Sequence, residues 1–497
     1  MSNFAFFPTE EQKENSNISR FMKKHKISSL GELSTKAKNN LEWFWKEVEK
    51  DIGIVWDKEY EKVLDLSKGL PWPQWFVGGK TNIYNSSVKK FSKLCPKKIA
   101  YTFVSEDGKI SQLTYSELEK KISKLANSLK SLGVKKGDVV AIYLPMIEES
   151  ILAIMAAAKI GAIQTVIFSG YSTDSLHVRL QDCNAKILFV CDGFYRKGKE
   201  VSQKTTIEKA VKNTGVEKII IVPYKGIDQY GKSENLEFYD ELVSGQSESC
   251  PTEITDSEDP LFILYTSGTT GKPKGVVHVH GGFSVFAGHQ SSFLIDTRPE
   301  DVILWPADIG WITGLVWNVY GLLIQGASAV IYDGSLDYPD FNRIWNLLEK
   351  YNVTIFGISP TAVRHKLEKI KNIPTTGEPL DEDSWWWLFE KVGNKKIPIM
   401  NLSGGTEIGG AMLSVLPGMK LKPSTVGIPC PGIDLEVVDD DGNSVRCKDG
   451  YLVIKTPWPA MTRGLLNNDE RYLETYWNRF ENLWFHGDYA FTLWNYK

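Results

Sequence analysis

The sequence predicts an α/β protein with two stacked sheets of mainly parallel strands and a smaller β subdomain. Short β-branched runs alternate with segments of helical period from about residue 138, and the alternation resumes near residue 301. After about residue 425 the expected helices stop, and short strands with Asp-Gly turns follow. A chain of 497 residues that is 42% hydrophobic can also bury a large core.

Residues 1–80 are predicted to form a helical extension that packs on the main body. They are polar, rich in Lys and Trp and without strand periodicity, and residues 41–51 are a candidate helix. The main body, residues 81–424, is expected to contain both α/β regions. In the first region the strand candidates are residues 138–145, 162–168 and 186–192, and the helix candidates are residues 147–161 and 174–183.

The second α/β region has the same alternation. Its strand candidates are residues 301–307, 328–334 and 353–359, and its helix candidates are residues 314–326 and 340–351. Residues 425–497 are predicted to form the small β subdomain, with strand candidates at 434–444 and 450–456.

Charge and cysteine content exclude several classes of protein. The chain has 58 basic and 61 acidic residues, so its net charge of -3 gives no broad attraction to nucleic acid or to an acidic membrane. Six scattered cysteines without a Cys-x-x-Cys pair argue against a zinc site and a disulfide framework, and fit a reducing cytoplasm. The N-terminus lacks the pattern of a secretory signal, and polar residues interrupt the longest apolar region, 151–168. We therefore expect a cytoplasmic protein without a membrane span or a nucleic-acid partner.

The segment LFILYTSGTTGKPKG, Leu261–Gly275, is typical of a loop that binds phosphate. An apolar strand candidate ends abruptly in glycines, hydroxyls and lysines, which bring backbone N–H groups, hydroxyl donors and positive charge to an anion. The candidate phosphate-binding residues are Thr266, Ser267, Gly268, Thr269, Thr270, Gly271 and Lys274. The spacing does not match the P-loop of Walker ATPases, because no Gly-Lys is followed by Ser or Thr. From composition alone, an ordinary flexible surface turn remains an alternative.

YTSGTTGKPKG resembles the signature loop of the adenylate-forming superfamily, which contains acyl-CoA synthetases, luciferases and the adenylation domains of peptide synthetases. Further segments follow in the order of that superfamily: DIGWITG (308–314), GEP (377–379), SGGTEIGG (403–410) and HGDYA (486–490). Within the superfamily the chain is most similar to AMP-forming acetyl- and propionyl-CoA synthetases, over nearly its whole length, including ERYLETYW (470–477). The resemblance implies the large N-terminal domain of these enzymes.

The resemblance also implies a reaction. A short-chain carboxylate attacks the α-phosphorus of ATP, pyrophosphate leaves, and the thiol of coenzyme A then attacks the acyl-adenylate. ATP, Mg²⁺ and coenzyme A are the implied substrates and cofactors. Lys274 would stabilise the charge of the departing pyrophosphate, Thr406 would contact the α-phosphate, and Glu407 would hold Mg²⁺. For Glu407 the alternative is a solvated surface glutamate.

Further site residues are implied by their positions in the motifs. Those of the adenine pocket are Gly377, Glu378, Pro379, Asn401, Leu402, Ser403, Gly404 and Gly405. Asp488 would accept hydrogen bonds from the ribose. The coenzyme A site corresponds to Arg196, Lys197, Gly198 and Lys199, with Thr313 at the thiol tunnel. A solvated run of charge is the alternative for residues 196–199. His278 and His280 are expected to be structural rather than metal ligands.

The acyl pocket corresponds to Trp311, Ile312, Thr313, Thr376 and Gly404. In acetyl-specific relatives a tryptophan closes the pocket floor at the position of Gly404. Its absence predicts a preference for C3–C4 acids, or hydroxylated C3–C4 acids, over acetate, because each extra buried CH₂ contributes about 0.8 kcal/mol. The alternative is that a neighbouring tryptophan refills the space.

Relatives of this kind continue beyond the HGD motif through a hinge into a smaller C-terminal lid domain, whereas this chain ends at Lys497. We therefore expect a truncated and poorly active enzyme without the lid. Two other functions stay open from the sequence: a non-catalytic module that binds nucleotide or acyl-adenylate, and an adenylating enzyme that delivers its acyl group to a carrier protein.

Overall fold

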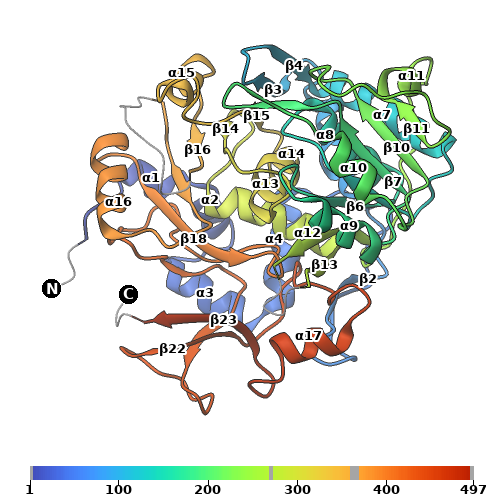
Figure 1. The fold of residues 1–497 in the computed structure, drawn as a ribbon. Coiled ribbons are helices and arrows are strands. Elements are labelled where there is room, and N and C mark those ends of the chain that lie inside the picture. The colour runs from blue at the N-terminus through green and yellow to red at the C-terminus, as the bar shows by residue number, and fades with distance from the viewer. Residues whose placement is uncertain (1–3, 268–271, 359–368, 493–497) are drawn as a thin grey trace.

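The computed structural model describes residues 4–267, 272–358 and 369–492 of the chain (Figure 1). Its architecture is mixed α/β, as predicted, with two larger sheets and buried helices between them. No helix among the described residues is long and apolar enough to cross a bilayer.

The first large sheet has seven strands. In spatial order they are β11 (Leu236–Phe238), β10 (Lys218–Val222), β7 (Ile187–Cys191), β5 (Val139–Ile142), β6 (Ile163–Val166), β12 (Pro260–Thr266) and β13 (Lys274–Val279). All neighbours are parallel except β12 and β13, which form an antiparallel pair.

Helices cover both faces of this sheet. Val140 and Phe189 belong to the same core cluster as the buried face of α8, whereas Ala141 and Leu188 pack with α9 and α10. Both faces are therefore apolar, which explains why these strands are continuous apolar runs in the sequence. The helices around the sheet are α7 (Tyr115–Ser131), α8 (Glu148–Lys159), α9 (Thr173–Asp182), α10 (Lys204–Ala210) and α11 (Tyr239–Val243).

The second large sheet has five strands in the order β16 (Ile355–Phe356), β14 (Val302–Leu304), β15 (Ser328–Asp333), β3 (Ile99–Ser105) and β4 (Ile110–Thr114). Only β3 and β4 are antiparallel. Apolar helices fill the centre of the molecule, and those after β13 and β14 are α12 (His280–His289), η1 (Gln290–Leu294), α13 (Ile312–Gly314), η2 (Leu315–Tyr320) and α14 (Gly321–Gln325). Other short helices are α5 (Ile83–Ser86), whose residues are all buried, α6 (Val88–Leu94), α15 (Arg343–Lys350), α16 (Glu382–Trp387) and η3 (Leu388–Val392).

Two smaller sheets complete the fold. One consists of β17 (Ile373–Thr375), β18 (Ile399–Gly405), β19 (Gly410–Ser414) and β20 (Ile428–Pro429), and the other of β21 (Leu435–Val438), β22 (Asp449–Ile454) and β23 (Trp484–Phe491). There are also two hairpins, β1 (Lys62–Asp65) with β2 (Gln74–Val77), and β8 (Phe194–Arg196) with β9 (Lys199–Val201).

The expectation that helices stop after residue 425 is wrong for one segment. Helix α17 (Asp469–Tyr476) lies between β22 and β23 in sequence. The side chain of Asn468 accepts a hydrogen bond from the backbone of Arg471 at 3.0 Å, and two acidic residues occupy the first turn. Both features stabilise the start of a helix.

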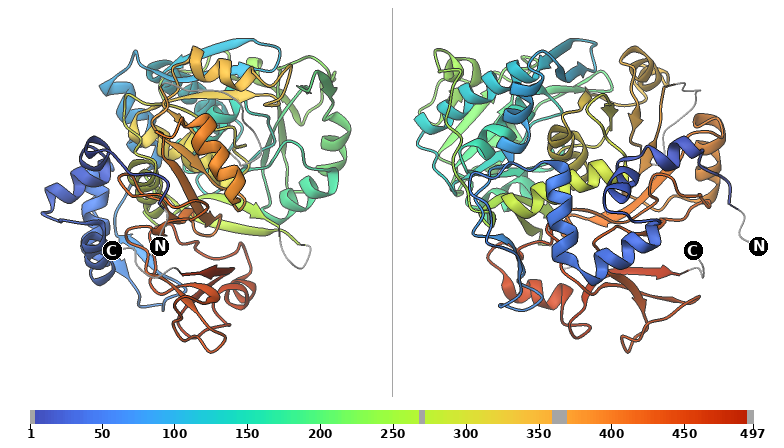
Figure 2. Two further views of the ribbon diagram at one scale, coloured as in Figure 1. Left: turned by 90° about the vertical axis from the view of Figure 1, so that its left-hand side faces the viewer. Right: turned by 180° about the vertical axis from the view of Figure 1, so that it is seen from behind.

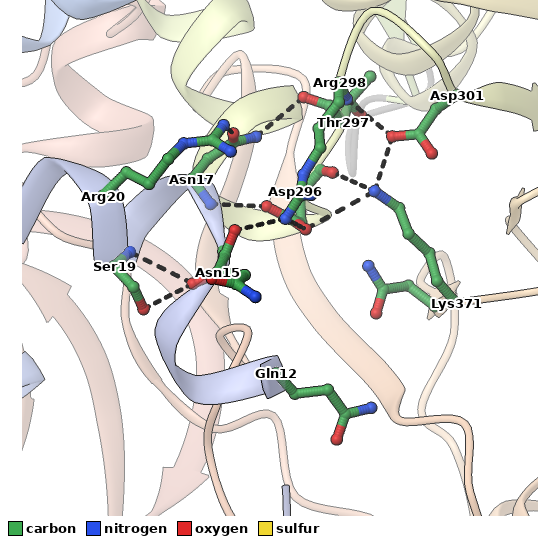
Figure 3. A network of polar contacts seen from close by, with 12 residues as sticks. Gln12, Asn15, Asn17, Ser19, Arg20, Asp296, Thr297, Arg298, Asp301 and Lys371 are labelled. Carbon is green, nitrogen blue, oxygen red and sulfur yellow. Dashed lines mark hydrogen bonds and ion pairs between the residues drawn. The ribbon is translucent and has the colours of Figure 1, made fainter. Parts of the chain in front are cut away.

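The N-terminal extension has helices at its start, which lie together across the back of the molecule (Figure 2), but residues 62–77 form the β1–β2 hairpin, a departure from the wholly helical extension that was expected. The helices are α1 (Glu10–Glu14), α2 (Asn17–Lys24), α3 (Leu30–Asn39) and α4 (Leu41–Ile52). The start of α2 is held by Asp296, whose carboxylate accepts the backbone N–H of Asn17 at 2.7 Å (Figure 3). Asp296 also pairs with Arg298 at 3.0 Å, and Lys371 donates to Asp301 at 2.7 Å.

Candidate active site

The two limbs of the glycine-rich loop are neighbouring antiparallel strands. Thr266 ends β12 opposite Lys274, which begins β13. Thr266 is half-buried, and its hydroxyl has no partner among the described residues, while Ser267 is exposed. Gly268, Thr269, Thr270 and Gly271 lie outside the described residues. The structure therefore describes the base of the loop, where Thr266 and Lys274 form the last residue pair of the two strands.

Lys274 and Glu407 come together through a third residue, Tyr476. The Lys274 Nζ donates to the Tyr476 Oη at 2.7 Å, and that hydroxyl donates to the Glu407 Oε1. The Lys274 Nζ is 3.4 Å from the same Glu407 oxygen. Burial raises the pKa of Glu407, but the Tyr476 hydrogen bond and the Lys274 charge oppose it and leave this pKa below its usual value. Glu407 is thus an ionised, enclosed carboxylate beside a cation.

Thr406 and Glu407 lie in the tight turn between β18 and β19, and each is only 8% exposed. The interpretation of Glu407 as a solvated surface residue is therefore wrong. Two contacts to backbone carbonyls fix this turn. His278 Nε2 lies 2.7 Å from the Thr406 carbonyl, and the Thr462 N–H donates to the Glu407 carbonyl at 3.1 Å. Burial lowers the pKa of His278 to about 4, so this histidine is a neutral structural support at pH 7.

His486 was not predicted as a site residue, yet β23 brings it beside Glu407. A methyl group on Gly405 would lie 3.2 Å from the His486 ring and 3.3 Å from the Glu407 carboxylate, so the glycine allows this approach. His486 Nε2 is 3.5 Å from the carboxylate of Asp488, whose side chain is largely exposed at the edge. Burial lowers the pKa of His486.

The segments predicted to bind adenine are neighbours. β17 pairs in parallel with β18, with Thr375 opposite Asn401, and Thr376 to Pro379 follow β17 directly. Gly377 has a φ of +100°, a conformation that favours glycine, and this turn is exposed. Parallel pairing therefore brings residues 376–379 and 401–405 to the same end of the sheet.

The backbone around position 404 requires a glycine, which the sequence alone did not indicate. A methyl group there would lie 1.9 Å from the Gly410 carbonyl oxygen and 2.6 Å from the Ala411 Cα, where the register between β18 and β19 shifts. This backbone has no room for any side chain at 404. Among the other predicted acyl-pocket residues, Trp311 is 45% exposed and packs on Phe168 and Tyr171, and Ile312, Thr313 and Thr376 are half-buried.

Arg196 to Lys199 form the tight β8–β9 hairpin, with Lys197 and Gly198 at positive φ. The Glu106 carboxylate accepts the backbone N–H groups of Lys197 at 3.0 Å and Gly198 at 2.7 Å, so the hairpin is anchored. Arg196 borders a cavity of about 390 Å³ that also contacts Met146, Trp305 and Asp308.

Residues 196–199 are all exposed, and the Lys197 side chain pairs with Asp337 on the surface at 2.6 Å, so a solvated run of charge stays an alternative for them. At the edge of the cavity, burial raises the pKa of Asp308 to about 6. Thr313, the predicted tunnel residue, follows Asp308 by five positions at the start of helix α13.

The donor set at Glu407 fits Mg²⁺. Among the described residues there is no group of three or more His, Cys, Asp or Glu side chains able to hold a metal. A single ionised carboxylate is nevertheless what Mg²⁺ uses when most of its other ligands are phosphate oxygens and water. The Lys274 ammonium lies 3.4 Å from this carboxylate, and Thr266, whose hydroxyl is buried, pairs with Lys274 across the two strands.

Two known families match the chain. Residues 88–466 match the AMP-binding enzyme family, and residues 31–86 match the acetyl-coenzyme A synthetase N-terminus. The first match covers well over half of the chain. The chain belongs to the AMP-binding enzyme family. This acyl-CoA synthetase is AMP-forming, as its motifs predict, and enzymes of its kind use ATP, Mg²⁺ and coenzyme A with a small carboxylic acid.

Individual relatives agree with the family. The chain is 40% identical to the acetyl-coenzyme A synthetase of Methanothrix thermoacetophila over 94% of its own length and 73% of the relative's. It is 39% identical to the acetyl-coenzyme A synthetase of Helicobacter pylori strain HPAG1, over 95% of its own length and 74% of the relative's. The structure of acetoacetyl-CoA synthetase from Streptomyces lividans superposes with a TM-score of 0.91 at 26% identity, covering 98% of this chain and 78% of that one.

These alignments do not support the expectation of a truncated, poorly active enzyme that lacks a lid domain. The synthetase matches nearly three quarters of the length of its acetyl-coenzyme A synthetase relatives.

Proposed function

We propose that this acyl-CoA synthetase activates a short-chain carboxylic acid and favours C3–C4 acids, or hydroxylated C3–C4 acids, over acetate. The observation that carries the adenylation chemistry is the group formed by Lys274, Tyr476 and Glu407 at the base of the phosphate loop. It combines a cation for phosphate with an ionised carboxylate in an enclosed site, where electrostatic interactions are stronger than in water.

In this proposal the acid's carboxylate attacks the α-phosphorus of ATP. Lys274 stabilises the negative charge that develops on the pyrophosphate, together with Thr266 and the loop that follows it. Thr406 contacts the α-phosphate from the turn after β18, and Glu407 holds Mg²⁺, which supplies charge neutralisation to the phosphates when bound. Residues 377–379 and 401–405 enclose the adenine, and Asp488 accepts the ribose hydroxyls at the exposed edge.

Coenzyme A is assigned to the cavity of about 390 Å³ beside Arg196. This volume lies within the range of small-molecule sites, and the anchored hairpin of residues 196–199 presents positive charge at the border of the cavity. Asp308, which borders this cavity, and Thr313 both belong to the segment DIGWITG, residues 308–314. Thr313 is assigned both to the thiol tunnel and to the acyl pocket, so this segment would connect the two.

The acyl preference depends on Gly404. Relatives of the chain are named acetyl-coenzyme A and acetoacetyl-CoA synthetases, so acids of two to four carbons are the range to consider. Position 404 is a glycine, so the tryptophan that closes the pocket floor in acetyl-specific relatives is absent at this position. Delivery to a carrier protein is disfavoured, because residues 31–86 match an N-terminal region characteristic of acetyl-coenzyme A synthetases.

The test is ATP–pyrophosphate exchange over a series of C2 to C6 acids, followed by thioester formation with coenzyme A. Exchange that is fastest with a C3 or C4 acid supports the whole proposal. Exchange that is fastest with acetate overturns the acyl preference and leaves the synthetase assignment intact. ATP binding without exchange for any acid would instead indicate a nucleotide-binding module.

A further inference from the structure

Helix α17 contacts the phosphate loop and Glu407 at the same time. Near its start, Arg471 donates from Nη2 to the Lys272 carbonyl at 2.9 Å and from Nη1 to the Pro273 carbonyl at 3.4 Å. At its end, Tyr476 binds Lys274 and Glu407. One helix therefore holds the limb of the loop that leads into β13 and also the two charged groups at its base.

Tyr476 is fixed in position by its surroundings. Its ring stacks on Trp484 with centroids 4.4 Å apart and planes 10° from parallel, and both side chains are buried. The preceding turn of α17 is held by the hydroxyl of Tyr472, which donates to the Pro71 carbonyl at 3.0 Å. The hydroxyl of Tyr476 is consequently held between Lys274 and Glu407 by the packing of its own ring.

The Tyr476 hydroxyl keeps the Lys274 ammonium and the Glu407 carboxylate farther apart than a direct hydrogen bond would. A direct hydrogen bond between an ammonium and a carboxylate measures about 2.7–2.9 Å. The Lys274 Nζ and the Glu407 Oε1 are 3.4 Å apart, and the Tyr476 oxygen accepts from one while it donates to the other. Among the described residues both side chains are hydrogen-bonded to this oxygen, so its loss would let them close into a direct ion pair. Such a pair would satisfy each charge with the other and leave both less available to a ligand.

We propose that Tyr476 is a positioning residue, which holds Lys274 and Glu407 apart so that the ammonium can bind phosphate and the carboxylate can bind Mg²⁺. This inference rests on the proposed function of the same site. It assigns to the segment ERYLETYW, whose part in the site the sequence did not indicate, the task of setting the geometry of the triphosphate pocket.

The substitution Tyr476→Phe isolates the hydroxyl. It keeps the ring that stacks on Trp484 and the ring face whose centroid lies 4.9 Å from the Lys274 Nζ. ATP binding is measured by calorimetry on the full chain, with and without Mg²⁺, beside thermal unfolding. We expect the affinity for Mg-ATP to fall about tenfold, as for loss of a hydrogen bond to a charged group, and the difference between ATP with and without Mg²⁺ to shrink. Glu474→Gln, at an exposed position of the same helix, is the matched control and should bind as the unchanged chain does.

A double-mutant cycle separates positioning from a merely structural role. In a Glu407→Gln background the ion pair no longer exists, so adding Tyr476→Phe should have little further effect on Mg-ATP binding. Equal losses in both backgrounds, or wild-type binding by Tyr476→Phe, would overturn the inference while ATP binding by the unchanged chain still supports the proposed function. Failure of the unchanged chain to bind ATP at all would overturn both.

Discussion

At position 404 a glycine lies at the register shift between β18 and β19. A Cβ atom there would meet the Gly410 carbonyl at 1.9 Å, and backbone cannot move aside as a flexible side chain can. We expect Gly404→Ala to lower the free energy of unfolding by about 1–3 kcal/mol, the usual cost of forcing atoms into a packed site. Urea denaturation measures this change. Gly231→Ala, where an added methyl group meets nothing within 4 Å, is the control and should be nearly neutral.

The buried side chain of His289 leads to a prediction about how stability depends on pH. Its ring is buried among Phe44, Trp45 and Phe286, and burial lowers its pKa to about 3, below the 6.5 of an exposed histidine. The unfolded chain therefore binds the proton more tightly, so stability is complete above pH 6.5 and falls as the pH decreases from 6.5 toward 3.

His289→Phe should remove this contribution and reduce the loss of stability between pH 7 and pH 5 by about 2 kcal/mol. Urea unfolding of both proteins at the two pH values measures it, and an unchanged pH dependence would contradict the assignment to His289.

At the scale of elements, prediction succeeded where a strand is buried on both faces. Residues 138–145, 162–168 and 186–192 contain β5, β6 and β7, because parallel strands covered by helices on both sides consist of apolar residues throughout. The sheet of β17 to β20 was not predicted as a separate unit. β17 and β20 have only three and two residues, and β18 ends in Ser-Gly-Gly, which has no strand periodicity.

The site shows the same division. Lys274 and Glu407 stand out in sequence because each belongs to a glycine-rich motif. Tyr476 does not, since it lies 202 residues from Lys274 and 69 from Glu407, and only the fold brings the three together. Helix α17 was not predicted from the sequence, although the capping residue Asn468 and the acidic pair after it are the local features by which this helix can be recognised.

The β8–β9 hairpin supports a prediction at this scale. Glu106 binds the backbone of Lys197 and Gly198, so Glu106→Gln should loosen the hairpin and weaken coenzyme A binding several-fold while ATP binding stays unchanged. Calorimetric titration with each ligand measures the two effects. Asp337→Asn, which removes only the exposed pair with the Lys197 side chain, is the control and should have little effect. An equal loss of ATP affinity would mean that Glu106 acts on the whole fold.

On the scale of the whole molecule, the N-terminal helices and the body are connected by one polar network (Figure 3). Asp296 bonds to the backbone of Asn17 and pairs with Arg298, and Lys371, which also donates to the Asp296 carbonyl, immediately precedes Asn372 and strand β17. Asp296→Asn keeps the shape and the acceptor for Asn17, and the left-handed backbone at 296 tolerates asparagine. It removes the negative charge that Arg298 and Lys371 face.

Because both basic groups are partly exposed, we expect this substitution to cost about 1–3 kcal/mol, less than breaking a fully buried pair. Hydrogen exchange should show the loss first at residues 17–24 and then at β17, which lies next to Lys371. The control is Lys24→Gln, which removes only an exposed pair of the same helix with Asp51 at 3.3 Å. Faster exchange spread evenly over the chain would show that the network stabilises the fold globally. Faster exchange confined to α2 and β17 would show that it fixes the N-terminal helices to the strand that leads into the proposed adenine pocket.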